Sequence, residues 1–144
     1  MKKLLLSFAM LALVISPALA DKHVKAGPRK GLIMELQGKN AEFFVEKDHT
    51  VSIAFYDASG KALTPSDEVV TATAEAPSGK AKLEFEKKGN LLVSKAPLPS
   101  GDGYQVVVQA KASADAKSKN FRVKLQLHTC AGCSNPEYAC TCDE

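Results

Sequence analysis

The sequence predicts an all-β protein built as an antiparallel β-sandwich with a cysteine-rich C-terminal tail. Short segments rich in β-branched and aromatic residues recur at intervals of roughly ten residues. Gly, Pro or Asn stands between most of these segments, where the chain has to turn. Outside the first twenty residues no stretch shows a convincing amphipathic helical repeat. Seven or eight short strands with this spacing are typical of an immunoglobulin-like sandwich.

The first twenty residues have the pattern of a signal peptide. Lys2 and Lys3 give a basic start, residues 4–15 are apolar, and Ala18 and Ala20 are the small residues of a cleavage site. The apolar run is too short to anchor the chain in a bilayer. We therefore expect an exported protein, periplasmic or secreted, without membrane insertion, whose mature chain begins at Asp21.

The mature chain divides into three parts. Residues 21–30 are expected to form a flexible N-terminus, residues 31–128 the β-sandwich domain, and residues 129–144 the cysteine-rich tail. Apolar and polar residues alternate most clearly along two of the segments, which predicts one buried face on each. The apolar alternation stops after Leu127, so the tail is expected to be appended to the last strand and to contribute nothing to the core. The predicted strands cover residues 31–37, 41–46, 50–57, 68–75, 81–87, 90–95, 104–111 and 121–127.

Charge and motif content argue against several classes of function. Without Lys2 and Lys3, the 19 basic residues of the whole chain nearly balance its 16 acidic residues, and the charges are interspersed. A nucleic-acid partner would require a dense basic face, so none is expected. The sequence has no nucleophile motif of the G-x-S-x-G type and no glycine-rich phosphate loop. An enzyme is not expected.

The cysteines carry the chemistry that the sequence offers. Cys130, Cys133, Cys140 and Cys142 follow the spacing C-x2-C-x6-C-x-C and include every cysteine in the chain. Four thiolates so close in sequence can converge on one Zn²⁺, or on Cu(I), which soft sulfur ligands favour. Gly132 allows a tight turn between the first two cysteines. This pattern predicts a binding site for a soft metal ion.

A disulfide-stapled tail is the alternative. An even number of cysteines in an exported protein usually forms disulfide bonds. The hairpin geometry would then pair Cys130 with Cys142 and Cys133 with Cys140, or cross them as 130–140 with 133–142. Under that interpretation the protein is an interaction module that binds no metal, and it has no cofactor.

Two further groups are candidate ligands. His128 precedes the cysteines on the polar side of the last strand, where it is a candidate fifth ligand or an outer hydrogen-bond partner. Cleavage after Ala20 would expose Asp21, Lys22 and His23. The free amine, two backbone amides and the imidazole of such a triplet can hold Cu(II) or Ni(II) in a square plane of four nitrogens.

Residues 27–63, with a glycine-rich start, an E-L pair and the turn "YDASGK", resemble small periplasmic immunoglobulin-like proteins associated with heavy-metal efflux systems. The resemblance implies an exported β-sandwich that handles metal, above all copper, and that serves an efflux or redox protein as partner. Together with the cysteines it leads to the expectation of copper (or zinc) handling or sequestration: Cu(I) at the tail and Cu(II) at the N-terminus.

Overall fold

The computed structural model describes residues 24–142, and nearly all of its regular structure is β. Nine strands occur in this part of the chain, and they pair antiparallel throughout. Within the same residues no helix is long and apolar enough to cross a membrane. The strands are β1 (Leu32–Glu35), β2 (Asn40–Val45), β3 (Val51–Tyr56), β4 (Ala62–Leu63), β5 (Val69–Ala76), β6 (Gly79–Lys88), β7 (Leu91–Ser94), β8 (Gln105–Lys111) and β9 (Lys119–Lys124).

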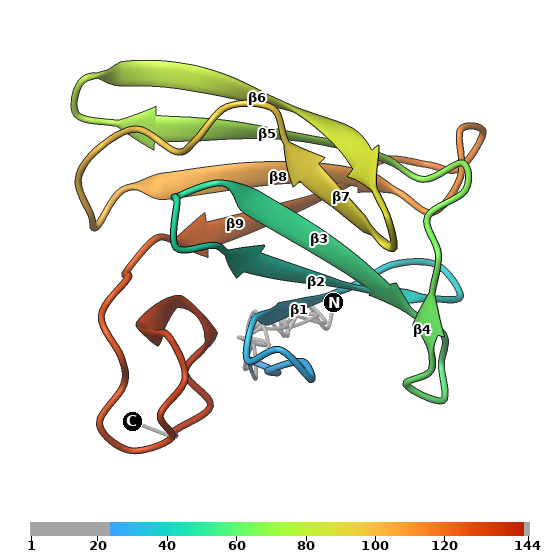
Figure 1. The fold of residues 1–144 in the computed structure, drawn as a ribbon, viewed down its shortest axis with the longest axis horizontal. Coiled ribbons are helices and arrows are strands. Elements are labelled where there is room, and N and C mark those ends of the chain that lie inside the picture. Colours follow the sequence, from blue (N-terminus) through green and yellow to red (C-terminus); the bar gives the residue numbers. More distant parts are fainter. Residues whose placement is uncertain (1–23, 143–144) are drawn as a thin grey trace, which may run out of the picture.

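The strands follow one another around the molecule in the order β1-β2-β3-β7-β6-β5-β8-β9, with β4 pairing on β3 (Figure 1). Strand β6 belongs to both layers, because its first half pairs with β5 and its second half with β7. The layer β1-β2-β3-β7-β6 and the layer β6-β5-β8-β9 form an antiparallel sandwich of the immunoglobulin-like type. The predicted all-β, immunoglobulin-like class is confirmed.

A tyrosine at the start of β8 supports the same assignment. The Tyr104 hydroxyl donates a hydrogen bond of 2.8 Å to the carbonyl oxygen of Pro99, five residues upstream. A tyrosine near the start of the sixth strand that bonds back to the preceding corner is a hallmark of immunoglobulin-like sandwiches. Burial raises the pKa of this phenol, which keeps it a hydrogen-bond donor at physiological pH.

The core lies between the two layers and is filled by the alternating side chains that the sequence indicated. On β3, Val51, Ile53 and Phe55 are essentially inaccessible. On β9 and the residues after it, Val123 and Leu125 are buried, and Phe121 and Leu127 pack against the core cluster. Each predicted strand overlaps an observed one within a few residues. The two-residue strand β4 was not predicted.

Residues 27–31, here called the N-terminal turn, carry defined structure, although part of this segment was expected to be flexible. The turn packs on the outer face of β2 and β3, where Glu42 is fully buried. One Glu42 oxygen accepts hydrogen bonds from the backbone N–H groups of Arg29 (2.9 Å) and Gly31 (2.8 Å). The other accepts from the Tyr56 hydroxyl at 2.7 Å.

Arg29 holds the same turn from outside. Its guanidinium donates to Ser52 Oγ at 2.7 Å and to Glu46 Oε1 at 2.6 Å, and it lies 4.6 Å from the centre of the Phe44 ring. Gly27 and Gly31 have no room for a side chain, since an added Cβ would stand within 2.4 Å of Glu42 or Phe43 atoms. The turn therefore fits closely over the buried carboxylate.

Candidate metal centre

The segment after β9 folds back on itself and forms a compact unit, residues 129–142, which we call the cysteine segment. Thr129 pairs with Pro136 in an isolated antiparallel bridge. Inside this bridge the Cys130 N–H donates to the Asn135 carbonyl at 2.8 Å, and the Ser134 N–H donates to the Cys130 carbonyl at 3.0 Å. Ser134 takes a left-handed conformation (φ 59°), which closes the turn. Cys130 and Cys133 are thus held on one tight loop.

A short 3₁₀ helix, η1 (Glu137–Ala139), anchors the segment to the sandwich. Tyr138 is 7% exposed and Ala139 is fully buried, and both belong to the core cluster. The Tyr138 ring meets Phe43 edge to face with centroids 5.7 Å apart, and its hydroxyl accepts a hydrogen bond of 3.1 Å from the Val45 N–H. Burial raises the pKa of this phenol.

This anchoring corrects one prediction. The tail was expected to contribute nothing to the core, and that expectation is wrong, because Tyr138 and Ala139 complete the core at the end near β1 and β2. The isolated tyrosine has no neighbouring apolar residue at strand or helix spacing, so alternation along the sequence does not reveal its burial.

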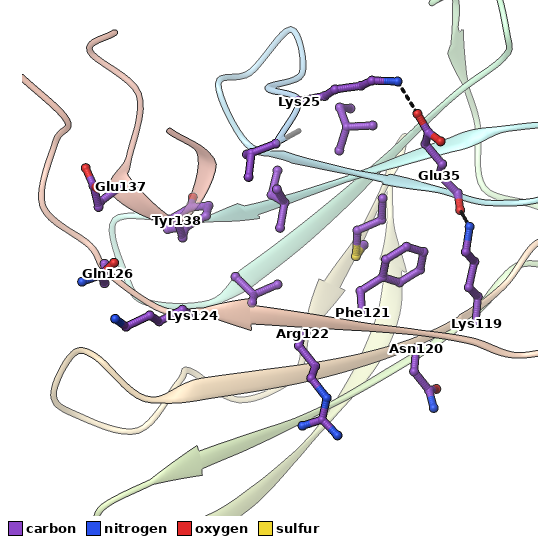
Figure 2. Close-up of a pocket in the computed structure, with 15 residues that line it drawn as sticks. Lys25, Glu35, Lys119, Asn120, Phe121, Arg122, Lys124, Gln126, Glu137 and Tyr138 are labelled. Atoms are coloured by element: carbon purple, nitrogen blue, oxygen red, sulfur yellow. Dashed lines mark hydrogen bonds and ion pairs between the residues drawn. The ribbon is translucent and has the colours of Figure 1, made fainter. Parts of the chain in front are cut away.

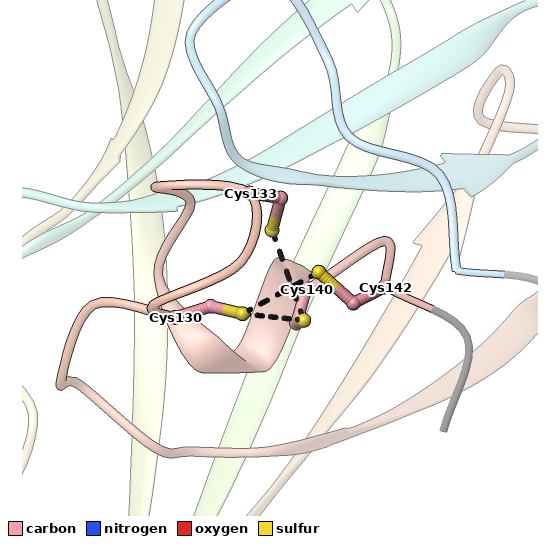
Figure 3. A group of neighbouring side chains, drawn as sticks. All are labelled: Cys130, Cys133, Cys140 and Cys142. Atoms are coloured by element: carbon pink, nitrogen blue, oxygen red, sulfur yellow. Dashed lines mark hydrogen bonds between the residues drawn. The ribbon is translucent and has the colours of Figure 1, made fainter.

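The fold brings the four cysteine sulfurs together (Figure 3). All four Sγ atoms lie within 4.8 Å of one another. Cys130 and Cys142 are 3.8 Å apart, Cys133 and Cys140 are 3.7 Å apart, and Cys140 approaches Cys130 to 2.9 Å. The first pair comes from the two ends of the segment and the second from its loop and its helix. Because Cys140 directly follows Ala139, the anchored helix fixes one side of the cluster.

The cluster fits a tetrahedral ion. Sulfurs bound at about 2.3 Å to a tetrahedral ion lie about 3.8 Å from one another. The Cys130–Cys142 and Cys133–Cys140 separations already have this length. Cys130 and Cys140 would need to move apart by somewhat less than 1 Å, a small rotation of either side chain.

Gly132 makes this arrangement possible. A Cβ added at Gly132 would stand 2.5 Å from the Cys142 sulfur. The sulfur therefore occupies the space that a side chain at position 132 would need. The Cys130 sulfur is 3.9 Å from the same point. The sequence indicated a glycine here because the chain turns. The structure adds a second reason, since the Cys142 sulfur approaches this position too closely for any side chain.

The electrostatic environment differs sharply among the sulfurs. Backbone N–H groups of Thr141 and Asn135 donate to the Cys133 sulfur and lower its pKa to about 6, which makes it a thiolate at neutral pH. The Cys140 thiol donates a hydrogen bond to the Cys130 sulfur at 2.9 Å, and this bond raises the pKa of Cys140 to about 12.

All four cysteines are free thiols in this structure, and no pair approaches the length of a disulfide bond, about 2.05 Å. Because every sulfur lies near every other, both disulfide pairings considered from the sequence remain within reach of side-chain rotation.

The other predicted ligands have different outcomes. His128 is exposed, and its Nε2 lies 3.8 Å from a Glu137 carboxylate oxygen; it is not among the ligand atoms that gather at the cluster. Asp21, Lys22 and His23, the predicted Cu(II) ligands, lie outside the residues that the structure describes, so that site stays a prediction.

A groove of about 890 Å³ lies beside the cysteine segment, between β1 and β9 (Figure 2). Leu32, Met34, Phe121 and Val123 form apolar walls, and Tyr138 closes one end. At the other end Lys119 Nζ donates to the backbone carbonyl of Glu35 at 2.6 Å and so links the two strands. The groove offers apolar surface, but it has no group of converging ligand atoms.

Comparison with known proteins gives no match to this chain: no family model, no curated protein and no solved structure matches it.

Proposed function

We propose that this protein is exported and binds a soft metal ion through Cys130, Cys133, Cys140 and Cys142, in order to handle or sequester that ion outside the cytoplasm. The observation that carries the proposal is the convergence of four sulfurs within 4.8 Å of one another on a folded segment. Close thiols gain little from burial or from their weak hydrogen bonds. A bound ion, in contrast, would be held by all four.

The donor set selects the class of ion. Sulfur ligands favour Cu(I) and Zn²⁺, and the hard cations Mg²⁺ and Ca²⁺ require oxygen ligands. Copper is our leading candidate, because it forms the stronger complexes with soft donors and because of the resemblance to efflux-associated proteins. Zinc is second. The proposed Cu(II) site at Asp21, Lys22 and His23 would add a separate binding step, and N-terminal acetylation should abolish it.

The partners follow from this function. An exported protein that holds a soft ion would exchange it with a metal-efflux protein, and a redox protein would keep its thiols reduced.

The test is a titration of Cu(I) and of Zn²⁺ into reduced protein, with wild type compared to the double variant Cys140→Ser/Cys142→Ser. We expect one Zn²⁺ or at least one Cu(I) per chain, near-ultraviolet thiolate-to-metal absorption for copper, and proton release on binding. The double variant should lose tight binding, since two thiolates leave the coordination shell incomplete. The double variant Ala131→Ser/Thr141→Ser is the matched control, because it changes exposed neighbours in the same turns and keeps all four thiols.

The same experiment distinguishes the metal site from the alternative, an interaction module with a disulfide-stapled tail. That alternative requires no free thiols in protein isolated from its compartment, and no difference in metal binding between wild type and the cysteine variant after reduction. Equal and weak binding by both proteins would overturn the proposed metal function.

A further inference from the structure

The four cysteines are not held equally. Cys130 is fixed by two backbone hydrogen bonds, and Cys133 lies inside the loop that these bonds close. Cys140 donates its N–H to the Glu137 carbonyl at 3.1 Å and follows the fully buried Ala139. The backbones of these three residues are therefore held in place by the loop or by the short helix that precedes Cys140.

Cys142 is different. It lies beyond η1, it is the exposed member of the four, and no backbone–backbone hydrogen bond within residues 24–142 involves it or Thr141. Its sulfur rests against Gly132, and both Gly132 and Ala131 are exposed. The Cys142 side of the cluster therefore faces solvent, where an incoming ligand could reach a bound ion after rotation of this one side chain.

We propose that Cys142 is the exchangeable ligand of the metal centre, and that a thiol of an acceptor molecule replaces it when the ion is transferred. This inference rests on the proposed function. In the exchange step the bond between the ion and Cys142 Sγ breaks and a bond to the acceptor sulfur forms. The proton of the acceptor thiol goes to the Cys142 sulfur, and the oxidation state of the ion does not change.

The arrangement suits transfer, because three anchored sulfurs keep the ion in place while the fourth position changes occupant. Release to the acceptor then proceeds one ligand at a time, without unfolding of the cysteine segment. The partner this site fits is a molecule that presents an accessible thiol, with at least a second thiol to complete the removal.

A rescue experiment with Co²⁺ as probe tests the inference. Co²⁺ takes the tetrahedral sites of Zn²⁺, and its visible spectrum reports the number of sulfur ligands. The variants Cys142→Ala and Cys140→Ala each leave three thiolates, and each should bind Co²⁺ at least roughly tenfold more weakly than wild type, as expected for an incomplete coordination shell. A small monothiol such as 2-mercaptoethanol is then added.

We expect the monothiol to restore the four-sulfur spectrum and most of the lost affinity in Cys142→Ala, because the open position faces solvent. In Cys140→Ala it should restore neither, because that position lies against the anchored helix. Equal rescue of both variants, or rescue of neither, would overturn the exchangeable-ligand inference while wild-type binding still supported the metal site. Absence of Co²⁺ and Zn²⁺ binding by wild type would overturn the proposed function itself, and this inference with it.

Discussion

The N-terminal turn and the cysteine segment both contact strand β2, but their polar groups are organised in opposite ways. In the turn, a fully buried Glu42 meets three donors, and Arg29 meets two acceptors and an aromatic ring. Within residues 24–142 no buried side-chain nitrogen or oxygen lacks a partner. In the cysteine segment, by contrast, four sulfurs lie close together with only weak hydrogen bonds between them.

This difference separates a structural device from a ligand set. A buried carboxylate with a complete set of donors stabilises the fold by itself, and nothing needs to be added. A cluster of four thiols adds little stability, so its close geometry supports the proposed metal binding. Tyr138 and Ala139 of the cysteine segment belong to the core, and its sulfurs form the candidate metal site.

The largest expected effect comes from removing the anchor of the cysteine segment. Tyr138→Ala should lower the free energy of unfolding of the metal-free protein by about 3–5 kcal/mol, the range for deleting a large buried aromatic side chain. Truncation after Thr129 should cost at least as much. Chemical denaturation checks both, and Tyr138→Phe, which keeps the ring, should cost only about 1 kcal/mol. A truncated protein as stable as wild type would restore the appended-tail interpretation.

Removal of the buried Glu42 carboxylate should have the second-largest effect on the free energy of unfolding. Glu42→Ala leaves two buried backbone N–H groups and the Tyr56 hydroxyl without their acceptor, which should cost roughly 3 kcal/mol. Metal binding should be unchanged, because Glu42 hydrogen-bonds to the turn and to Tyr56 and the sulfurs hydrogen-bond to one another. The control is Glu84→Gln, which breaks an exposed ion pair with Lys95 and should have an effect near zero. Reduced metal affinity of Glu42→Ala would show that the two regions are coupled.

Gly132→Ala should act on the site and leave the fold intact. The added methyl group would stand where the Cys142 sulfur lies, so metal affinity should fall about tenfold or more, which is about 1.4 kcal/mol in binding free energy. The free energy of unfolding of the metal-free protein should change little, since Gly132 lies in an exposed loop. Ala131→Gly in the same loop is the control for backbone flexibility. Unchanged affinity of Gly132→Ala would show that Cys142 is not a ligand.

The smallest expected effect is the dependence of the free energy of unfolding on pH. Because the folded-state pKa of Cys133 is lowered to about 6, its ionisation stabilises the metal-free fold above the unfolded-state value near 9. This contribution is lost as the pH falls through about 6. The change in the free energy of unfolding should be slight, because the sulfur is partly exposed and solvent screens its charge. Absorbance near 240 nm should show a thiolate titrating near pH 6, and Cys133→Ser should remove that step. A first thiolate that appears only near pH 8–9 would contradict the hydrogen-bonded arrangement.

The strands could be predicted because their information is local. The alternation Val51, Ile53, Phe55 on β3 encodes a buried face directly, and turn residues mark the strand ends. The cysteine spacing likewise predicts the cluster, because sixteen tail residues can bring four thiols together in few ways.

What could not be predicted depends on contacts between distant residues. Glu42 reads as a polar strand residue, and only the packing of residues 27–31 across it makes it buried. Tyr138 pairs with Phe43 and Val45 across most of the chain, and the two-residue strand β4 exists only through its pairing with β3. Turn residues in the sequence did mark the corner before Tyr104. The hydrogen bond from Tyr104 to Pro99 could be expected only once the immunoglobulin-like fold was known.

The most direct test of the metal centre is X-ray absorption spectroscopy of the reduced protein loaded with one equivalent of Zn²⁺. The geometry of the cysteine segment predicts four sulfur neighbours at about 2.3 Å and no nitrogen or oxygen in the first shell. A shell of fewer than four sulfurs, completed by nitrogen or oxygen at about 2.0–2.1 Å, would contradict the four-thiolate site.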